Sequence, residues 1–567
     1  MQPQFRGEGA ACAASLLNAL RTERLREMAG NPFFLTAMAA LHRPDKPLPD
    51  TSAELMHLLV NGVLEESRKP GPGAGGRTGE PELAALLRPI KDGLKVLRLR
   101  LEAIAYAARE KRQDHASRLV DEDLLRARLL LDKKVNDEWV DRLIECLLHR
   151  AGLLQSPDGA HFEFAYRFEE FLAGCHLANR DAWVKVQPSF VKRTRELLKK
   201  QGDYARQVVI WAAGVNAHVQ IDRSTVRELV SELTPRATVA GAASLTDLEL
   251  AADIARDAGM DHWQDEDVPD TSDTVCRLRA RLEEVRDATR GFDIQARSRA
   301  ASAIGRFGDP RQGVGLRADG LPGIAFDIEI PPGPFQMGDP PKKCDAITEP
   351  CRISRFPVTV AQYQTFVAAA GYEDDGSDEA TQRLLRWWTP ESLGWKRDKG
   401  ITGPDENDPV FQTPNHPRVG VSWYESMAFC RWLSEEWKKD IALPSEAQWE
   451  RAARHTDGRL YPWGQEEGDI AQRCNMGTTG IGHTSAVGLF PSGKADCGAM
   501  DMSGNVWEWC EDLYEANQPY RVLRGGSWIV LDPRLLRSAY RGLGGPGRRG
   551  DYVGFRVVCV WVGSAGG

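Results

Sequence analysis

The sequence of 567 residues has no run of about 20 apolar residues that could cross a bilayer, and no secretory signal pattern at its start. Its eleven cysteines include neither a CxxC pair nor zinc-finger spacing. These absences predict a cytoplasmic protein with reduced thiols and no membrane partner.

Neither sign of charge is in large excess, since the formal net charge is only -8. A balance this small predicts no nucleic-acid partner. Arginines do gather between Arg521 and Val558, so phosphate binding there stays open as an alternative. With 42% hydrophobic and 27% charged residues, the chain has the composition of a soluble globular protein of three or four domains.

Several catalytic signatures are missing. The one GxxxxGK match, Gly488 to Lys494, is followed by Ala495, so the hydroxyl that would bind Mg²⁺ is absent. There is no HExxH motif, hydrolytic triad or paired-carboxylate signal. Nucleotide binding by this match and simple hydrolytic chemistry are therefore not expected.

The N-terminal half contains residues typical of the starts of helices. Asn31 and Pro32 suit the N-cap and first helical position of an apolar run, and Thr51 with Glu54 has the spacing of a capping box. Residues 69–81 are rich in Gly and Pro and predict a flexible linker. A polar turn at residues 156–159, followed by apolar helical spacing, predicts a hairpin and helix as in a winged-helix unit.

The segments NPFFLTAMAALH and HFEFAYRFEEFLAGCHLA resemble the helical region and winged-helix end that follow the nucleotide-binding core of NACHT-type signalling ATPases. No phosphate-binding motif precedes them. The resemblance therefore implies that the ATPase core was lost, that it is carried by a separate NTPase or signalling subunit, or that the chain begins at an internal start. Residues 181–320 predict a helical linker domain with one HEAT-like repeat at 296–311.

After about residue 320 long helices become rare, and tryptophan, glycine and proline become frequent. Three short helices are predicted by capping boxes at Thr359 with Gln362, Ser422 with Glu425, and Ser445 with Gln448. The ordered motifs IEIPPGPFQMGD, HPRVGVSWYESMAFCRWLS, MDMSGNVWEW, RVLRGGSW and GFRVV resemble the formylglycine-generating-enzyme or sulfatase-modifying domain, a variant of the C-type lectin fold.

That resemblance implies copper-dependent oxidases with two cysteines shortly after the GGS motif, because soft thiolates hold Cu(I). Here the matching positions are Val530 and Leu535, and no cysteine lies between Cys510 and Cys559. Histidine is too sparse for the three-histidine iron site of the related sulfoxide synthases. We therefore predict that the domain is not an enzyme and needs no cofactor, with an oxidoreductase of this family as the alternative. The resemblance also implies structural calcium at Asp501 and Glu508.

The same fold is used by variable proteins of diversity-generating retroelements, whose variable segment runs from GGSW to GFR, as residues 528–555 do here. Residues 529–553 contain no Lys, Glu, Gln, Met or Trp, which the mutation of adenines in AAY codons cannot produce. Exposed apolar side chains in such a patch are costly to solvate unless a partner covers them. The resemblance then assigns ligand contact to Ile529, Val530, Leu531, Leu535, Tyr540, Gly542, Leu543, Gly544, Gly545, Arg548, Gly550, Asp551 and Tyr552. Val530 and Leu535 have a second interpretation as core residues.

The sequence thus predicts a multidomain chain, all-α in its N-terminal half, with an α+β C-type lectin-like domain at its C-terminus. The predicted boundaries are a helical segment at 1–68, the linker at 69–81, a winged-helix-like domain at 82–180, the helical linker domain at 181–320, and the lectin-like domain at 321–562. The predicted function is the binding of a protein or other macromolecular ligand at a diversified surface, coupled through the helical half to a signalling or conflict-response assembly.

Overall fold

The computed structural model describes residues 15–16, 32–42, 48–49, 51–66, 83–111, 119–130, 135–149, 151–158, 161–165, 167–179, 189–239, 241–405 and 408–560. The predicted linker at 69–81 lies outside the described residues. None of the described helices combines the length and the apolar character that a membrane crossing requires.

The chain divides into two compact units. The helical unit comprises residues 1–236 with 250–278, and the C-terminal unit comprises residues 237–249 with 279–567. The C-terminal unit therefore begins well before residue 321. Residues 279–320, which the sequence assigned to a helical linker, belong largely with the lectin-like domain.

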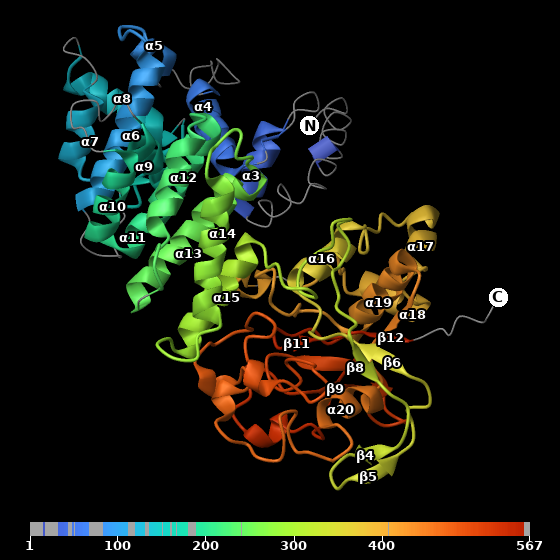
Figure 1. Cartoon of the computed structure of the whole chain (residues 1–567). Helices are drawn as coiled ribbons and strands as arrows, with labels where there is room; N and C mark the ends of the chain where they lie inside the picture. Colours follow the sequence, from blue (N-terminus) through green and yellow to red (C-terminus); the bar gives the residue numbers. More distant parts are fainter. Residues whose placement is uncertain are drawn as a thin grey trace. The chain divides into compact units, whose positions relative to one another are not determined.

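Helices make up most of the first half of the chain, drawn in blue to green in Figure 1. They are α3 (Pro32–Leu41), α4 (Ser52–Glu66), α5 (Leu83–Leu87), α6 (Gly93–Lys111), α7 (Glu122–Leu129), α8 (Asp137–His149), α9 (Phe168–Ala178), α10 (Phe190–Gln201), α11 (Asp203–Gly214), α12 (Arg223–Leu233), α13 (Gly241–Ala258), α14 (Thr271–Arg286) and α15 (Ile294–Phe307). Helix α4 begins as its capping box predicts, with the Glu54 N–H donating to Thr51 Oγ1.

A two-stranded hairpin precedes α9, as the sequence predicts. Strand β1 (Leu154–Gln155) pairs antiparallel with β2 (Glu163–Phe164). Helix α9 then packs on α11, where the rings of Phe171 and Trp211 meet edge to face with centroids 5.4 Å apart. Gly174 permits this approach, because a β-carbon there would lie 2.6 Å from the Trp211 Cβ.

The C-terminal unit consists of short strands joined by long loops, drawn in yellow to red in Figure 1. One four-stranded sheet has the order β3 (Ile328–Ile330), β6 (Cys351–Ile353), β12 (Val558–Val560), β7 (Asp440–Ala442). The other has the order β10 (Gly542–Gly544), β9 (Arg521–Arg524), β8 (Trp507–Leu513), β11 (Val553–Gly554). A separate pair is formed by β4 (Phe335–Met337) and β5 (Lys342–Cys344).

The three predicted capping boxes are all present. Thr359, Ser422 and Ser445 each cap a helix reciprocally, and these helices are α16 (Val360–Ala368), α19 (Trp423–Trp437) and α20 (Glu446–Arg454). Two further helices, α17 (Asp378–Leu384) and α18 (Pro390–Asp398), were not predicted. A buried aromatic cluster joins α16 and α19 to the sheets, and its fully buried members include Tyr363, Phe366, Phe429, Trp509 and Phe555.

Candidate ligand-binding surface

The predicted contact residues lie between 529 and 552 of the variable segment 528–555, in loops, a short 3₁₀ helix and strand β10 around the half-buried ring of Trp507. The ring packs against the apolar cluster that contains Val530 and Leu536. The Tyr540 ring centroid lies 6.0 Å from that of Trp507, and the Trp507 backbone N–H donates to the Tyr552 carbonyl at 2.9 Å. Parts of the segment that are distant in sequence therefore meet at one residue. We call them together the 529–552 surface.

The structure places the thirteen predicted contact residues in three groups. Six are exposed, namely Ile529, Leu531, Tyr540, Leu543, Arg548 and Asp551, and five are partly buried, namely Leu535, Gly542, Gly545, Gly550 and Tyr552. Val530 and Gly544 are buried. Four large apolar side chains stand out, with exposed fractions of 43% for Ile529, 69% for Leu531, 39% for Tyr540 and 42% for Leu543.

Val530 and Gly544 do not offer side chains to a ligand. Val530 packs into the cluster that includes Tyr461 and Met476, so its interpretation as a core residue is the one the structure favours. A β-carbon at Gly544 would lie 2.6 Å from the Trp509 ring. Glycine is required there by packing beneath β10, which is a correction to the assignment of Gly544 as a contact residue.

Partly buried ion pairs hold these loops to helices α19 and α20. The guanidinium of Arg541 donates from Nε and Nη2 to the two Glu446 carboxylate oxygens at 2.6 and 2.8 Å. Arg549 donates from Nε to Glu425 Oε2 at 2.8 Å, and Glu425 is fully buried. Bidentate arginine–carboxylate pairs hold a fixed geometry, so they make the loop framework rigid.

One exposed ion pair lies within the segment itself. Asp532 caps the short 3₁₀ helix Pro533–Leu536 and accepts hydrogen bonds from the backbone and side chain of Arg534. The Arg534 side chain holds the pKa of Asp532 below its usual range. This pair is local to the turn, and an exposed pair of this kind adds little to stability.

The residues present do not fit a copper site at the positions that the family resemblance implies. Val530 and Leu535 belong to an apolar cluster, in which the one cysteine is Cys474. Burial raises the pKa of the Cys474 thiol above its usual range, and its Sγ lies 3.6 Å from the Ile470 carbonyl. A protonated, buried thiol is a poor ligand for a soft metal.

Glu508 also fits a calcium site badly. Its Oε2 accepts from Trp449 Nε1 and Arg556 Nε, both at 2.6 Å, and its Oε1 accepts from Arg556 Nη2 at 2.8 Å. Burial raises the pKa of Asp501 to about 6, and Asp501 Oδ2 accepts from the Gly488 N–H at 2.7 Å. Among the residues that the structure describes, no group of three or more His, Cys, Asp or Glu side chains is placed to hold a metal ion.

Two tryptophans border this surface. Trp507 and Trp528 are both half-buried. Trp528 Nε1 donates to the Asp551 carbonyl at 3.0 Å, and its ring lies 5.8 Å from that of Phe411. Side chains two apart in a strand share a face, so the sequence of β8 predicts that Trp507 and Trp509 lie on the same face of the sheet. It does not predict that Trp507 is only half-buried whereas Trp509 is buried.

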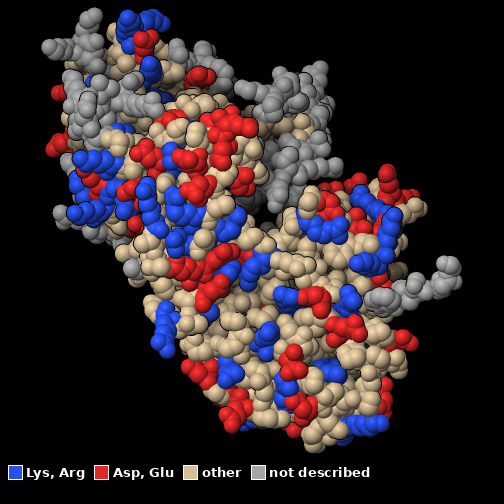
Figure 2. Space-filling view, in the orientation of Figure 1, with Lys and Arg blue, Asp and Glu red and all other residues tan. Residues whose placement is uncertain are grey.

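Charged side chains of both signs are interspersed on the face of the C-terminal unit that Figure 2 shows. No continuous basic surface of the kind that follows a phosphate backbone is visible on this face.

Comparison with known proteins gives two family matches. Residues 324–560 match the sulfatase-modifying factor enzyme 1-like domain, and residues 53–177 match the winged helix-turn-helix domain C-terminal to NACHT. The second match confirms the predicted winged-helix unit and its resemblance to the domain that follows NACHT.

Curated relatives align with the C-terminal half. The inactive C-alpha-formylglycine-generating enzyme 2 of Bos taurus is 34% identical over 246 residues, which is 36% of this chain and 76% of that protein. The formylglycine-generating enzyme of Streptomyces coelicolor is 29% identical over 287 residues, which is 41% of this chain and 88% of that protein. The hercynine oxygenase of Mycolicibacterium smegmatis is 29% identical over 291 residues, which is 42% of this chain and 62% of that protein. The chain spans only 57–63% of the length of three hercynine oxygenases among its relatives.

These relatives contradict the prediction that the domain is not an enzyme. Hercynine oxygenases and formylglycine-generating enzymes, at 27–30% identity, are named for catalytic activities. The missing cysteine pair argues only against copper chemistry at that site. It does not argue against the other activities of the family.

Two solved structures are also similar. Treponema denticola variable protein 1 has a TM-score of 0.31 at 20% identity, covering 41% of this chain and 94% of that one. PvdO from Pseudomonas aeruginosa has a TM-score of 0.31 at 25% identity, covering 41% and 93%. Scores this low carry no functional argument.

Proposed function

The chain belongs to the family of the sulfatase-modifying factor enzyme 1-like domain, and from this premise we propose that its C-terminal domain binds a macromolecular ligand through the 529–552 surface. The observation that carries the proposal is the exposure of Ile529, Leu531, Tyr540 and Leu543 within one anchored segment. Aliphatic and aromatic side chains in such numbers favour a surface that a partner covers.

The framework beneath the surface supports the same function. The Arg541–Glu446 and Arg549–Glu425 pairs fix the backbone of the loops, while the side chains of Leu531, Tyr540 and Leu543 project from it. A rigid scaffold that presents variable loops loses little conformational entropy on binding.

We further propose that the surface is diversified by a retroelement. The supporting observation is that residues 529–553 contain no Lys, Glu, Gln, Met or Trp, which adenine mutation of AAY codons cannot produce. The decisive observation is genomic: a near-copy of the DNA for residues 528–555, differing mainly at adenines, beside a reverse transcriptase gene. A complete genome without both would contradict the proposal.

We also propose a partner for the helical half of the chain. The match to a winged-helix domain C-terminal to NACHT supports coupling of ligand capture to a separate NTPase or signalling subunit. Co-purification of the full chain with an ATPase, and the loss of that ATPase when residues 53–177 are deleted, would be the expected result.

An oxidation is the second candidate, favoured by the names of the hercynine oxygenases and formylglycine-generating enzymes among the relatives. Its site would not be the copper pair, because Val530 and Leu535 carry no thiolate. Oxygen consumption by the full chain with hercynine or a cysteine-containing peptide, in the presence of iron or copper, tests this candidate directly.

Binding is tested by placing a photo-crosslinking residue at Leu531 or Leu543 of the full chain in its native cells. The matched control is Leu385, which is 42% exposed but lies outside the 529–552 surface. We expect one discrete adduct at Leu531 and Leu543, competed by excess wild-type chain but not by the L531R/L543R variant. An identical adduct pattern at Leu385 would contradict ligand binding at this surface.

A further inference from the structure

The segment from Gly477 to Phe490 contacts the 529–552 surface at its first residue. The Gly477 N–H donates to the Val530 carbonyl at 2.8 Å. The next side chain, Leu531, lies over Gly477 so closely that a β-carbon at Gly477 would be 2.6 Å from Leu531 Cδ2. The most exposed apolar residue of the surface is therefore positioned by the short 3₁₀ helix Gly477–Thr479.

The same segment is held by the first turn of α15, which precedes the residues matched by the family. Gln295 Nε2 donates to the Thr479 carbonyl at 2.6 Å, and Arg297 Nη2 donates to the Leu489 carbonyl at 3.0 Å. Ile294 packs with Leu489 and Phe490 in a buried apolar cluster. One helix turn thus contacts both ends of the segment on which Leu531 rests.

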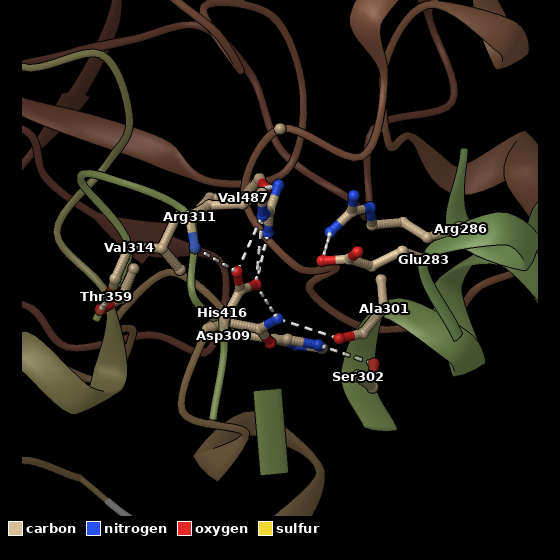
Figure 3. A network of polar contacts seen from close by, with 12 residues as sticks. Glu283, Arg286, Ala301, Ser302, Asp309, Arg311, Val314, Thr359, His416 and Val487 are labelled. Carbon is tan, nitrogen blue, oxygen red and sulfur yellow. Dashed lines mark hydrogen bonds and ion pairs between the residues drawn. The ribbon is translucent and has the colours of Figure 1, made fainter. Parts of the chain in front are cut away.

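The rest of α15 is fixed to the domain as well, as Figure 3 shows. Ser302 Oγ lies 2.9 Å from His416 Nε2, and Asn415 Nδ2 donates to the Ala301 carbonyl at 2.9 Å. Beyond the helix, Arg311 Nη1 donates to the Val487 carbonyl at 2.8 Å, at the far end of the same segment. Because α15 is anchored along its length, its first turn is a fixed support.

We propose that Gln295 is a positioning residue of the 529–552 surface and that the ligand-binding module begins at the start of α15. Gln295 acts through the Thr479 carbonyl, which fixes the 3₁₀ helix, which in turn fixes Val530 and Leu531. The biological meaning of this role rests on the proposed ligand-binding function. The contacts of Gln295 with the Thr479 carbonyl do not.

A consequence follows from chain order. Helix α15 is the last helix before the residues that the family model matches, so the chain enters those residues through the element that supports Leu531. A ligand that displaces Leu531 would act on α15 through two contacts, Leu531 with Gly477 and Thr479 with Gln295. This gives ligand capture a direct physical route to the helix that leads from the N-terminal half.

Hydrogen exchange on the full chain tests the positioning role without any ligand. Replacement of Gln295 with Ala removes the donor, and we expect the Gly477 amide to exchange about 5-fold faster, because a hydrogen bond of this kind stabilises the closed state by about 1 kcal/mol. Gln295→Glu keeps the size of the side chain but cannot donate, so it should have the same effect. Gln295 is exposed, so neither variant should unfold the helix.

The matched control is Arg299→Ala, which removes an exposed α15 side chain paired with Glu249 and should leave Gly477 exchange within 2-fold of wild type. Equal exchange in Q295A, Q295E and R299A would overturn the positioning role. In Q295A and Q295E, but not in R299A, the Leu531 photo-crosslink should weaken while the Leu543 crosslink persists. If neither crosslink forms in the wild type, the proposed binding function fails, and the exchange result still decides the role of Gln295.

Discussion

Arg549 and Glu425 join the 529–552 surface to the N-terminus of α19 through a pair whose carboxylate is fully buried. Arg549 Nε donates to Glu425 Oε2 at 2.8 Å, and the same carboxylate accepts from the Tyr372 hydroxyl and completes the capping box of Ser422. A charge in this position requires its partner, since a buried carboxylate without a counterion is strongly unfavourable.

Replacement of Arg549 with Ala should therefore lower the free energy of unfolding by about 3 kcal/mol. Urea unfolding followed by tryptophan fluorescence measures it, because most tryptophans lie in the C-terminal unit. The control is Arg548→Ala, whose exposed side chain contacts Tyr552, and it should change stability by less than about 0.5 kcal/mol. Equal effects of the two variants would show that Glu425 does not need this partner.

Asp501 predicts a pH dependence of known sign. Burial raises the pKa of Asp501 in the folded protein to about 6, above its ordinary value of 3.8. Between these two values the folded state binds more protons than the unfolded state, so the contribution of Asp501 to stability falls as pH rises and is fully lost above about 6. Two pKa units correspond to about 3 kcal/mol.

Replacement of Asp501 with Asn should remove this loss. Asn keeps an acceptor for the Gly488 N–H and tolerates the left-handed backbone at this position, where φ is 57°. We expect D501N to melt higher than wild type at pH 7.5 and the difference to shrink toward pH 4. Asp532→Asn is the opposite case, because the pKa of Asp532 is lowered by Arg534. D532N should melt only slightly lower than wild type at neutral pH, because this pair is exposed, and a rise as large as that of D501N would contradict the assignment.

Gly305 in α15 packs against the Asn415 side chain so closely that a β-carbon at Gly305 would overlap it. Gly305→Ala should displace Asn415 from the Ala301 carbonyl and from Asp309, and destabilise the domain by about 2 kcal/mol despite the better helix propensity of alanine. Gly394→Ala is the matched control, because Gly394 lies in α18 with nothing within 4 Å of the added carbon. It should stabilise by about 0.5–1 kcal/mol, as measured in thermal melts. Stabilisation by both variants would show that α15 does not pack tightly on Asn415.

Local chemistry made much of the fold predictable. The capping boxes at Thr359, Ser422 and Ser445 depend on residues three apart, and all three helices begin where expected. Helix α18 could not be predicted in the same way, because its capping box pairs Thr389 with Ser392 and not with the usual Glu or Gln. The contacts of α15 could not be predicted, since Gly305 and Asn415 meet only through the tertiary fold.

The same limit applies to the candidate surface. Irregular loops have no periodicity that separates inward from outward side chains, so Val530 and Leu531 look alike in sequence although one is buried and the other exposed. Exposure at such positions is decided by tertiary neighbours, here Tyr461 and Met476 around Val530. The framework was more predictable, because arginines placed in a glycine-rich loop need carboxylate partners wherever they are buried.

Val530 and Leu531 provide the final prediction, because they are adjacent residues of the same segment with opposite environments. Val530 is 6% exposed and Leu531 is 69% exposed. Val530→Ala should lower the free energy of unfolding by about 2 kcal/mol through the loss of buried methyl groups, whereas Leu531→Ala should change it by less than about 0.5 kcal/mol.

A deep mutational scan of the two positions, with stability and ligand capture measured separately, checks this contrast. Position 530 should tolerate only apolar residues of similar volume, and position 531 should accept polar and charged residues without loss of folding. Changes at 531 should then alter ligand capture in the Leu543 crosslinking assay at unchanged stability. If position 530 accepts charged residues as readily as 531 does, the apolar cluster around Tyr461 is not the support of this surface, and the surface must be held by the arginine pairs alone.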